Sequence, residues 1–181
     1  MKNIILGVTG SISAYKAADI ANGLVKAGHN VNVIMTEAAK GFITPLTMQS
    51  LTKNRVYSGV LQEEDPSIIA HIELAKTADA LLIAPATANI IGKLAVGIAD
   101  DMLTSCVLAV KDIPKMIAPA MNCRMYENEA VQDNLGRLGA RGWRIIEPRS
   151  GRLACGDTGK GALAPVDDII LLVKEALGEK A

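Results

Sequence analysis

Short apolar runs alternate with stretches of helical periodicity along most of the chain. The apolar runs that predict strands cover residues 4–8, 31–35, 80–84, 115–118 and 143–146, and the last of these is expected to be the final strand. Apolar residues recur at helical spacing over residues 13–27, 88–96, 103–110, 129–141 and 166–177, and a further helix is expected to begin at Glu37. Because a strand, a helix and a strand follow one another first, these two strands are predicted to be parallel.

The order of the elements predicts one α/β domain over residues 1–181. Runs that are apolar throughout are typical of strands buried on both faces, which indicates a three-layer, Rossmann-like (flavodoxin-like) doubly wound parallel sheet. No repeat or low-complexity linker interrupts the chain. With 50% hydrophobic residues, a chain of this length can form a large core without disulfides.

Polar or glycine residues follow four of the predicted strands. They are Gly10 and Ser11, Thr36, the segment PATAN at 85–89 and the segment PAMN at 119–122. Because ligands of doubly wound sheets bind beyond the carboxyl ends of the strands, these segments predict one site at a single edge of the sheet.

The turn after the first strand is suited to a phosphate. Gly10 and Ser11 at a helix start offer N–H groups, a hydroxyl and the positive end of a helix dipole. The second and third glycines of the G-x-G-x-x-G pattern are absent and no acidic residue ends the second strand, which disfavours NAD. The P-loop pattern is absent too. The polar side chains of Thr36, Thr87 and Asn89 fit a mononucleotide such as FMN better, although both threonines have helix capping as an alternative role.

Composition excludes several classes of partner. Lys and Arg number 19 and Asp and Glu number 19, and no basic stripe with aromatic residues is present, so nucleic acid is not an expected partner. The apolar segments are too short to span a bilayer, so no membrane partner is expected. Cys106, Cys123 and Cys155 form an odd set without a CxxC pair or a signal-like start. This favours reduced thiols in the cytoplasm and no metal site.

Three side chains are candidates for chemistry. Cys155 lies in a stretch with four glycines, 151–161, which predicts either a segment that closes over something or a flexible surface loop. His71 lies among apolar residues, where a histidine is either structural or a base. Asn122 is a neutral donor able to hold a carboxylate, with helix capping as the alternative. The other histidine, His29, is expected to be exposed at a turn.

With these segments in place, the chain resembles the homo-oligomeric flavin-containing cysteine decarboxylase family. The matching motifs are GSISAYK at 10–16, HIELA at 71–75, PATAN at 85–89 with Lys93, ADDMLT at 99–104, PAMN at 119–122 with Met125, and the Cys155 loop. The resemblance implies an FMN enzyme of coenzyme A biosynthesis that turns 4'-phosphopantothenoylcysteine into 4'-phosphopantetheine and carbon dioxide. In that reaction the cysteine side chain is oxidised to a thioaldehyde, carbon dioxide leaves, and the enethiol is reduced.

The same resemblance implies roles for individual residues. His71 matches a catalytic histidine, Asn122 the residue that binds the substrate carboxylate, and Cys155 the acid of the reductive half. The positions that match residues around FMN are Gly10, Ser11, Ile12, Thr36, Phe42, Thr87, Ala88, Asn89, Ser105 and Ala120. The positions that match substrate-binding residues are Asn122, Met125, Ala154, Cys155, Gly156 and Lys160.

The resemblance also implies an assembly. Flavin and substrate are expected between the subunits of a homotrimer, and the trimers can associate into a dodecamer. In many bacterial relatives a phosphopantothenoylcysteine synthetase is fused to such a chain, and otherwise it is a separate partner. The amphipathic closing helix of this chain favours a free-standing decarboxylase. One position departs from the family pattern, because Ala162 stands where an arginine is common. Lys160 and Arg152 are candidates to replace that guanidinium.

Other functions on this fold remain as alternatives. A peptidyl-cysteine oxidative decarboxylase would leave the enethiol unreduced, and Cys155 counts against it. A flavin-binding regulatory subunit would carry an acidic tail or lack catalytic residues, and this chain shows neither feature. Flavin prenyl transfer would leave His71, Asn122 and the cysteine loop without a use.

Overall fold

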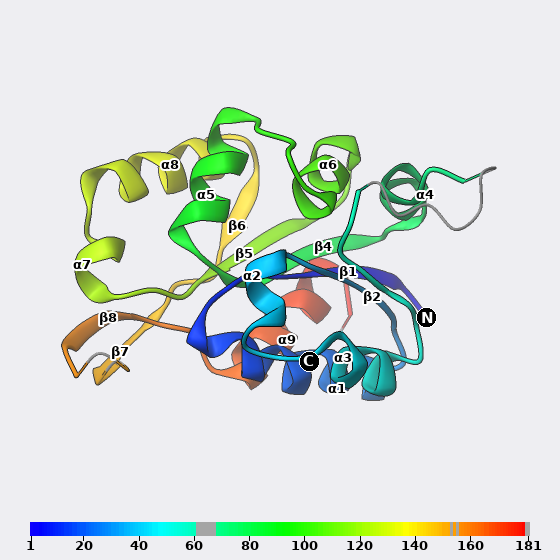
Figure 1. The fold of residues 1–181 in the computed structure, drawn as a ribbon, viewed down its shortest axis with the longest axis horizontal. Coiled ribbons are helices and arrows are strands. Elements are labelled where there is room, and N and C mark those ends of the chain that lie inside the picture. Colours follow the sequence, from blue (N-terminus) through cyan, green and yellow to red (C-terminus); the bar gives the residue numbers. More distant parts are fainter. Residues whose placement is uncertain (61–67, 153, 155, 180–181) are drawn as a thin grey trace.

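A parallel sheet forms the centre of the molecule (Figure 1). The computed structural model describes residues 1–60, 68–152, 154 and 156–179. The strands are β1 (Asn3–Val8), β2 (Asn30–Met35), β3 (Val56–Tyr57), β4 (Ala80–Ala86), β5 (Lys115–Pro119) and β6 (Trp143–Ile145). Their order in the sheet is β3-β2-β1-β4-β5-β6, and every neighbouring pair is parallel. This parallel order belongs to the doubly wound, Rossmann-like type of sheet that the sequence predicts.

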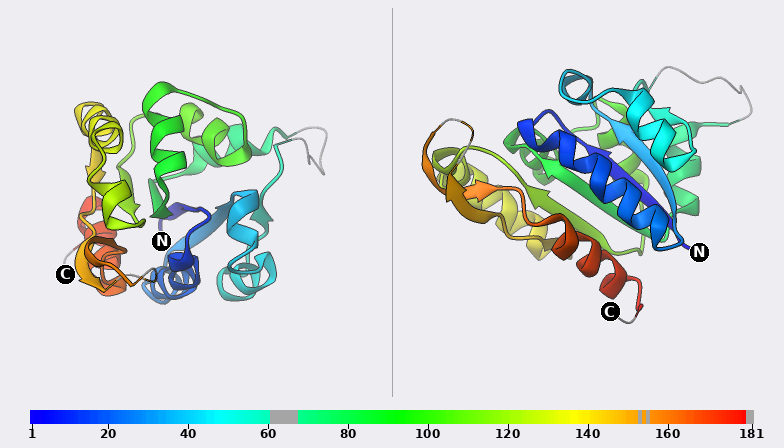
Figure 2. Two further views of the ribbon diagram at one scale, coloured as in Figure 1. Left: turned by 60° about the vertical axis from the view of Figure 1, so that its left-hand side comes forward. Right: turned by 90° about the horizontal axis from the view of Figure 1, so that it is seen from below.

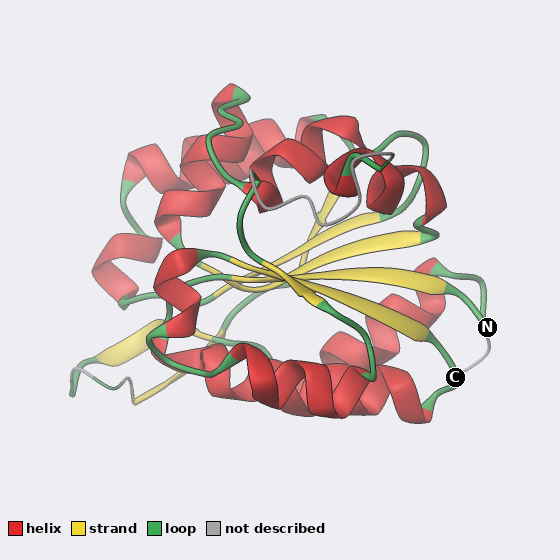
Figure 3. Cartoon of the chain, turned by 45° about the vertical axis from the view of Figure 1, so that its right-hand side comes forward, coloured by secondary structure: helices red, strands yellow, loops and turns green. Residues whose placement is uncertain are grey.

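Helices cover both faces of the sheet (Figure 3). One face packs against α1 (Lys16–Lys26), α3 (Pro45–Thr52) and α9 (Val166–Ala176). The other packs against α4 (Ala70–Thr77), α5 (Ala88–Val96), α6 (Met102–Ala109) and α8 (Glu129–Ala140). Three single-turn elements, η1 (Ile12–Tyr15), α2 (Glu37–Lys40) and α7 (Cys123–Tyr126), lie beyond the carboxyl ends of β1, β2 and β5.

The strands divide their side chains between the two layers. In β1, Ile4 and Leu6 join the core beneath α1 and α9, whereas Ile5 joins the core beneath α5 and α6. All seven residues of β4 are buried. Each fully buried aliphatic side chain contributes roughly 1.5–3 kcal/mol relative to an exposed one, so this double burial explains why the strands read as unbroken apolar runs.

A two-stranded antiparallel hairpin, β7 (Arg149–Arg152) and β8 (Thr158–Ala162), stands apart from the sheet. Figure 2 shows it beyond the sheet, close to α7. The strand predicted over residues 143–146 is confirmed as β6, the last strand of the parallel sheet, but the prediction that it is the last strand of the chain is wrong because the hairpin follows it. The glycine-rich stretch lacks the apolar alternation of a buried strand, because most of its residues lie at the surface.

Two of the four glycines in this stretch are packing positions rather than hinges. A Cβ atom at Gly159 would lie 2.7 Å from the Cβ of Cys123, and a Cβ at Gly161 would overlap the carbonyl oxygen of Met121. The Met121 N–H donates to the Gly161 carbonyl at 2.9 Å. The hairpin is thus held closely against the segment that follows β5. Cys155 lies outside the described residues.

Other sequence predictions differ locally from the structure. The sequence did not predict α3, α4 or the edge strand β3, whose apolar residues are too few to give a clear period. His29 is buried rather than exposed, with its Nε2 3.4 Å from Oε2 of Glu179 beyond α9. Among the described residues, no helix is long and apolar enough to cross a membrane.

Candidate functional site

The carboxyl ends of β1 and β4 mark the point where the strand order reverses. In a doubly wound sheet this crevice is the general ligand-binding position. Thr9, directly after β1, is buried, and its hydroxyl donates to the Pro85 carbonyl at 2.7 Å and accepts from the Thr87 N–H at 3.1 Å. These two bonds fix the turn after β1 against the turn after β4.

A cavity of about 390 Å³ lies at this crevice, and we name it the Thr87 cavity. Its walls are formed by Thr9, Gly10, Thr36, Glu37, Ala38, Thr87, Ala88, Asn89, Ile90, Lys93, Asp101 and Met125. A Cβ atom on Gly10 would lie 2.5 Å from the Cβ of Ala38, so only glycine permits the turn to pass so close to α2. The volume is within the range of small-molecule sites.

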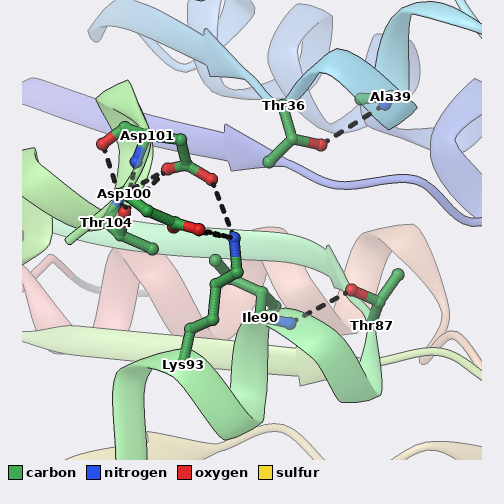
Figure 4. Close-up of polar contacts among 8 residues, drawn as sticks. All are labelled: Thr36, Ala39, Thr87, Ile90, Lys93, Asp100, Asp101 and Thr104. Atoms are coloured by element: carbon green, nitrogen blue, oxygen red, sulfur yellow. Dashed lines mark hydrogen bonds and ion pairs between the residues drawn. The ribbon is translucent and has the colours of Figure 1, made fainter. Parts of the chain in front are cut away.

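Two threonine hydroxyls in this cavity cap helices, as Figure 4 shows. Thr36 Oγ1 accepts from the Ala39 N–H at 3.3 Å, and Thr87 Oγ1 accepts from the Ile90 N–H at 3.3 Å. Because a hydroxyl can accept and donate at once, each retains its hydrogen for an acceptor in the cavity. Capping and ligand binding are therefore compatible roles for both residues.

Lys93 and Asp101 in the wall of the Thr87 cavity belong to a charged cluster, whose contacts Figure 4 shows. Lys93 Nζ lies 2.7 and 2.8 Å from the carboxylate oxygens of Asp100 and 3.7 Å from Oδ2 of Asp101. The hydrogen bond from Lys93 lowers the pKa of Asp100, and the same bond raises the pKa of Lys93. Asp101 also caps α6 by accepting from the Thr104 N–H at 2.8 Å. The lysine charge is thus matched by two carboxylates.

A second cavity, of about 340 Å³, adjoins the first across the Gly10–Ser11 turn, and we name it the Asn122 cavity. Its described walls are Ser11, Ile12, Ser13, Tyr15, Lys16, Ala120, Met121, Asn122, Arg149, Arg152, Ala154, Gly161 and Ala162. The hairpin therefore forms one wall and the turns after β1 and β5 form the others.

The side chain of Asn122 is held in one orientation. Its Oδ1 accepts from the Arg124 N–H at 2.8 Å, which makes Asn122 the cap of α7. Its Nδ2 donates to Oδ2 of Asp157 at 3.0 Å. The backbone bond determines which amide atom is the oxygen, so the NH₂ group faces the hairpin and its carboxylate.

Lys160 is engaged elsewhere on the hairpin. Its ammonium pairs with the carboxylate of Glu147 and lies 5.5 Å from the ring centre of Tyr126. The hydrogen bond from Lys160 lowers the pKa of Glu147. Burial, aided by the Glu147 carboxylate, raises the pKa of Tyr126 to about 12. These contacts fasten β8 to α7 and direct Lys160 away from the Asn122 cavity.

Comparison with known proteins gives the family. A model described as Flavoprotein matches residues 1–178. The chain belongs to the Flavoprotein family. This Flavoprotein chain is 54% identical over 177 residues to a probable phosphopantothenoylcysteine decarboxylase of Streptococcus mutans, and the match covers 97% of this chain and 99% of that protein. It is 49% identical to the coenzyme A biosynthesis bifunctional protein CoaBC of Bacillus subtilis, of which it spans 44%.

Solved structures agree with the Flavoprotein assignment. A PPC decarboxylase mutant complexed with pantothenoylaminoethenethiol matches with a TM-score of 0.87 and 30% identity, over 96% of this chain and 97% of that one. The FMN-dependent cysteine decarboxylase SpaF matches with a TM-score of 0.83 and 32% identity, over 98% and 95%.

The two cavities suit the flavin that the family implies. The Thr87 cavity offers two hydroxyl donors, and the bare Gly10 turn permits close approach to its wall. Of the predicted FMN-binding residues of this Flavoprotein chain, Gly10, Thr36, Thr87, Ala88 and Asn89 line the Thr87 cavity. Ser11, Ile12 and Ala120 line the adjoining one.

Some of the predicted site residues do not line either cavity, whereas three of the predicted substrate-binding residues do. Phe42 is 48% exposed after α2, His71 lies in the first turn of α4, and Ser105 lies on α6. Gly156 is exposed with φ of +90°. Of the predicted substrate-binding residues, Asn122 and Ala154 line the Asn122 cavity and Met125 lines the Thr87 cavity.

Several residues of the cavity walls are not among the site residues predicted from the sequence. Thr9 and Asp101 follow or flank apolar segments, and their polarity at those positions was an available signal. Lys16 lies in the GSISAYK motif, whereas Arg149 had no signal in the sequence, because the position of the hairpin decides that both residues line one cavity. Among the described residues, no three His, Cys, Asp or Glu side chains form a group able to hold a metal ion.

Proposed function

We propose that this chain is an FMN-dependent decarboxylase that converts 4'-phosphopantothenoylcysteine into 4'-phosphopantetheine and carbon dioxide in coenzyme A biosynthesis. The observation that carries the proposal is the identity of 54% to a probable phosphopantothenoylcysteine decarboxylase over nearly the full length of both chains. Two structural relatives support the choice of cofactor and substrate class, since one is an FMN-dependent cysteine decarboxylase and the other is complexed with pantothenoylaminoethenethiol.

The donor set of the Thr87 cavity would hold FMN. Thr36 and Thr87 would donate their hydroxyl hydrogens, and the Gly10 turn would lie against the bound group. FMN, when bound, would supply a reversible two-electron oxidation, which an amino-acid carboxylate needs because its carbon has no other electron acceptor. The electrons taken from the substrate's CH₂–SH group would return to the product, so the reaction has no net redox change.

Asn122 would bind the carboxylate that leaves as carbon dioxide. Its Nδ2 already donates to a carboxylate, that of Asp157, which supports this polarity and orientation. A neutral amide orients the substrate without forming an ion pair that would stabilise its negative charge before the carbon–carbon bond breaks. Cys155 would then donate a proton to the substrate carbon in the reductive half, a role suited to a thiol with an ordinary pKa of about 8.5.

We infer that a second copy of the chain completes the site. His71 does not line either cavity among the described residues, yet its Nδ1 is buried without a hydrogen-bond partner there. Ile12, Phe42 and Met125 are exposed by 58%, 48% and 49% around the same edge of the sheet. A homotrimer, alone or within a dodecamer, would bring His71 of one subunit to the flavin of its neighbour. Cys106 and Cys123, which are free thiols in the described part of the chain, support a location in the cytoplasm. A synthetase would be the preceding enzyme.

The test is product analysis by mass spectrometry with FMN-loaded protein and 4'-phosphopantothenoylcysteine. Wild type is expected to give 4'-phosphopantetheine, Cys155→Ser an enethiol product with two fewer hydrogens, and His71→Asn no product. An enethiol from the wild type would indicate a peptidyl-cysteine type of decarboxylase instead. FMN binding without release of carbon dioxide would indicate a regulatory flavoprotein.

A further inference from the structure

The Asn122 cavity concentrates positive charge. Lys16 reaches it from the start of α1, and Arg149 and Arg152 reach it from the two ends of β7. No Asp or Glu is present among its described walls, although the carboxylate of Asp157 accepts the hydrogen bond from the wall residue Asn122 that is described above. None of the three cations forms an ion pair with a described residue, so their charges are not neutralised within the described part of the chain.

The adjoining Thr87 cavity has no unpaired cation among its described walls. Its lysine, Lys93, is matched by Asp100 and Asp101, and the other carboxylate of its walls, Glu37, pairs with Lys40 at 2.6 Å. An anionic group therefore gains favourable electrostatic energy in the Asn122 cavity and not beside Lys93. The separation of charge between two adjoining cavities indicates different ligand groups in each.

The hairpin register brings Arg149 to the same wall as Ala162. The two residues are direct partners across the antiparallel pair, and both line the Asn122 cavity. Residues directly opposite each other point to the same side of such a pair. Ala162 adds only a methyl group there, so the charge on this part of the wall comes from Arg149. Lys160 does not contribute, because Glu147 holds its ammonium.

We propose that Lys16, Arg149 and Arg152 form a subsite for the terminal phosphate monoester of the substrate. This inference rests on the proposed function. A phosphate monoester carries nearly two negative charges at neutral pH, and a guanidinium can bind two of its oxygens at once. Two arginines and a lysine around one cavity match that charge and geometry.

The phosphate of FMN has the same chemistry, and the position of Asn122 favours the substrate. Asn122, which would bind the carboxylate at one end of the substrate, lines the same cavity as the three cations. Most of the residues expected around FMN line the other cavity. One substrate molecule would therefore bind with its carboxylate at Asn122 and its phosphate at the three cations, all in the Asn122 cavity.

The experiment measures binding to the FMN-loaded protein by calorimetry, with 4'-phosphopantothenate and pantothenate as probes. Wild type is expected to bind the phosphorylated probe more tightly. Arg149→Gln and Arg152→Gln are each expected to weaken its binding about tenfold and to leave pantothenate binding unchanged. Arg149→Lys is expected to restore part of the loss. The control is Arg144→Gln, which removes the same charge from β6, where Arg144 pairs with Glu175 at 3.1 Å.

The subsite would be overturned if the wild type bound both probes equally well. It would also be overturned if the Arg149 and Arg152 variants lost equal affinity for both probes, or if the Arg144→Gln control lost as much affinity for the phosphorylated probe as they do. Release of FMN by the Arg149 and Arg152 variants, with the probe preference intact, would overturn it too by assigning the cations to the flavin phosphate. Because neither probe is turned over, a wild type that binds as expected but releases no carbon dioxide would contradict only the proposed reaction.

Discussion

At the scale of single residues, the glycine-rich stretch has three kinds of glycine. Gly159 and Gly161 have no room for a side chain beside Cys123 and Met121, and Gly156 has a positive φ. Gly151 has neither constraint, since no atom lies within 4 Å of its would-be Cβ. The density of glycine therefore reflects close packing of the hairpin as much as freedom to bend.

Gly161→Ala is expected to destabilise the protein by roughly 1–3 kcal/mol, because the new methyl group meets backbone rather than a movable side chain. Gly151→Ala is the matched control and is expected to be neutral or slightly stabilising. Urea unfolding followed by the fluorescence of Trp143, the single tryptophan, measures both. Equal stability of the two variants would contradict the packing role of Gly161.

At the scale of elements, helix starts make the binding edge of the sheet. Thr36 caps α2 and Thr87 caps α5, both directly after strands and both in the wall of the Thr87 cavity. Thr44 caps α3 by the same geometry, accepting from the Thr47 N–H at 3.3 Å, and does not line either cavity. The same local motif thus occurs with and without a position in the site.

Thr87→Ala is expected to cost about 1 kcal/mol of stability as a lost cap and to weaken FMN binding about tenfold as a lost donor. Thr44→Ala is expected to cost similar stability with no change in FMN affinity. Thr87→Ser should retain both properties. Thermal unfolding of the apoprotein and quenching of FMN fluorescence separate the two effects. A Thr87→Ala variant with wild-type FMN affinity would remove Thr87 from the cofactor site.

At the scale of the whole molecule, the described chain brings together only part of the predicted machinery. The turns after β1, β2, β4 and β5 gather around two cavities, whereas His71 on α4 and Phe42 after α2 do not line them. Within the described residues, the unpartnered Nδ1 of His71 and the exposed apolar side chains near the edge support a site shared between copies.

Subunit mixing tests this arrangement. His71→Asn and Asn122→Asp are each expected to abolish decarboxylation alone, because each removes one group from every site. Mixed oligomers are expected to regain activity, because some sites then combine an intact His71 and an intact Asn122 from different subunits. Activity of co-expressed, doubly tagged oligomers and their mass by ultracentrifugation provide the measurement. Mixed oligomers that remain inactive, or an active monomer, would contradict a shared site.

Much of the fold could be predicted from the sequence, because parallel strands that are buried on both faces appear as unbroken apolar runs. β1, β2, β4 and β5 fall within two residues of their predicted bounds, and α5 matches at both ends. The edge strand β3 and the hairpin could not be predicted, since their strands are short and most of their residues are exposed or half-buried. The burial of His29 was also missed, because Glu179 reaches it from the far end of the chain.

Local patterns were sufficient to predict the doubly wound sheet, the edge of the sheet where the two cavities lie and the motifs that resemble those of flavin-containing decarboxylases, since these depend on local periodicity and on residues next to strand ends. Which cations face the Asn122 cavity depends on tertiary packing. Lys160 turns to Glu147, and Arg149 stands opposite Ala162. These relations depend on hairpin register and on packing between segments distant in sequence, and no local pattern encodes them.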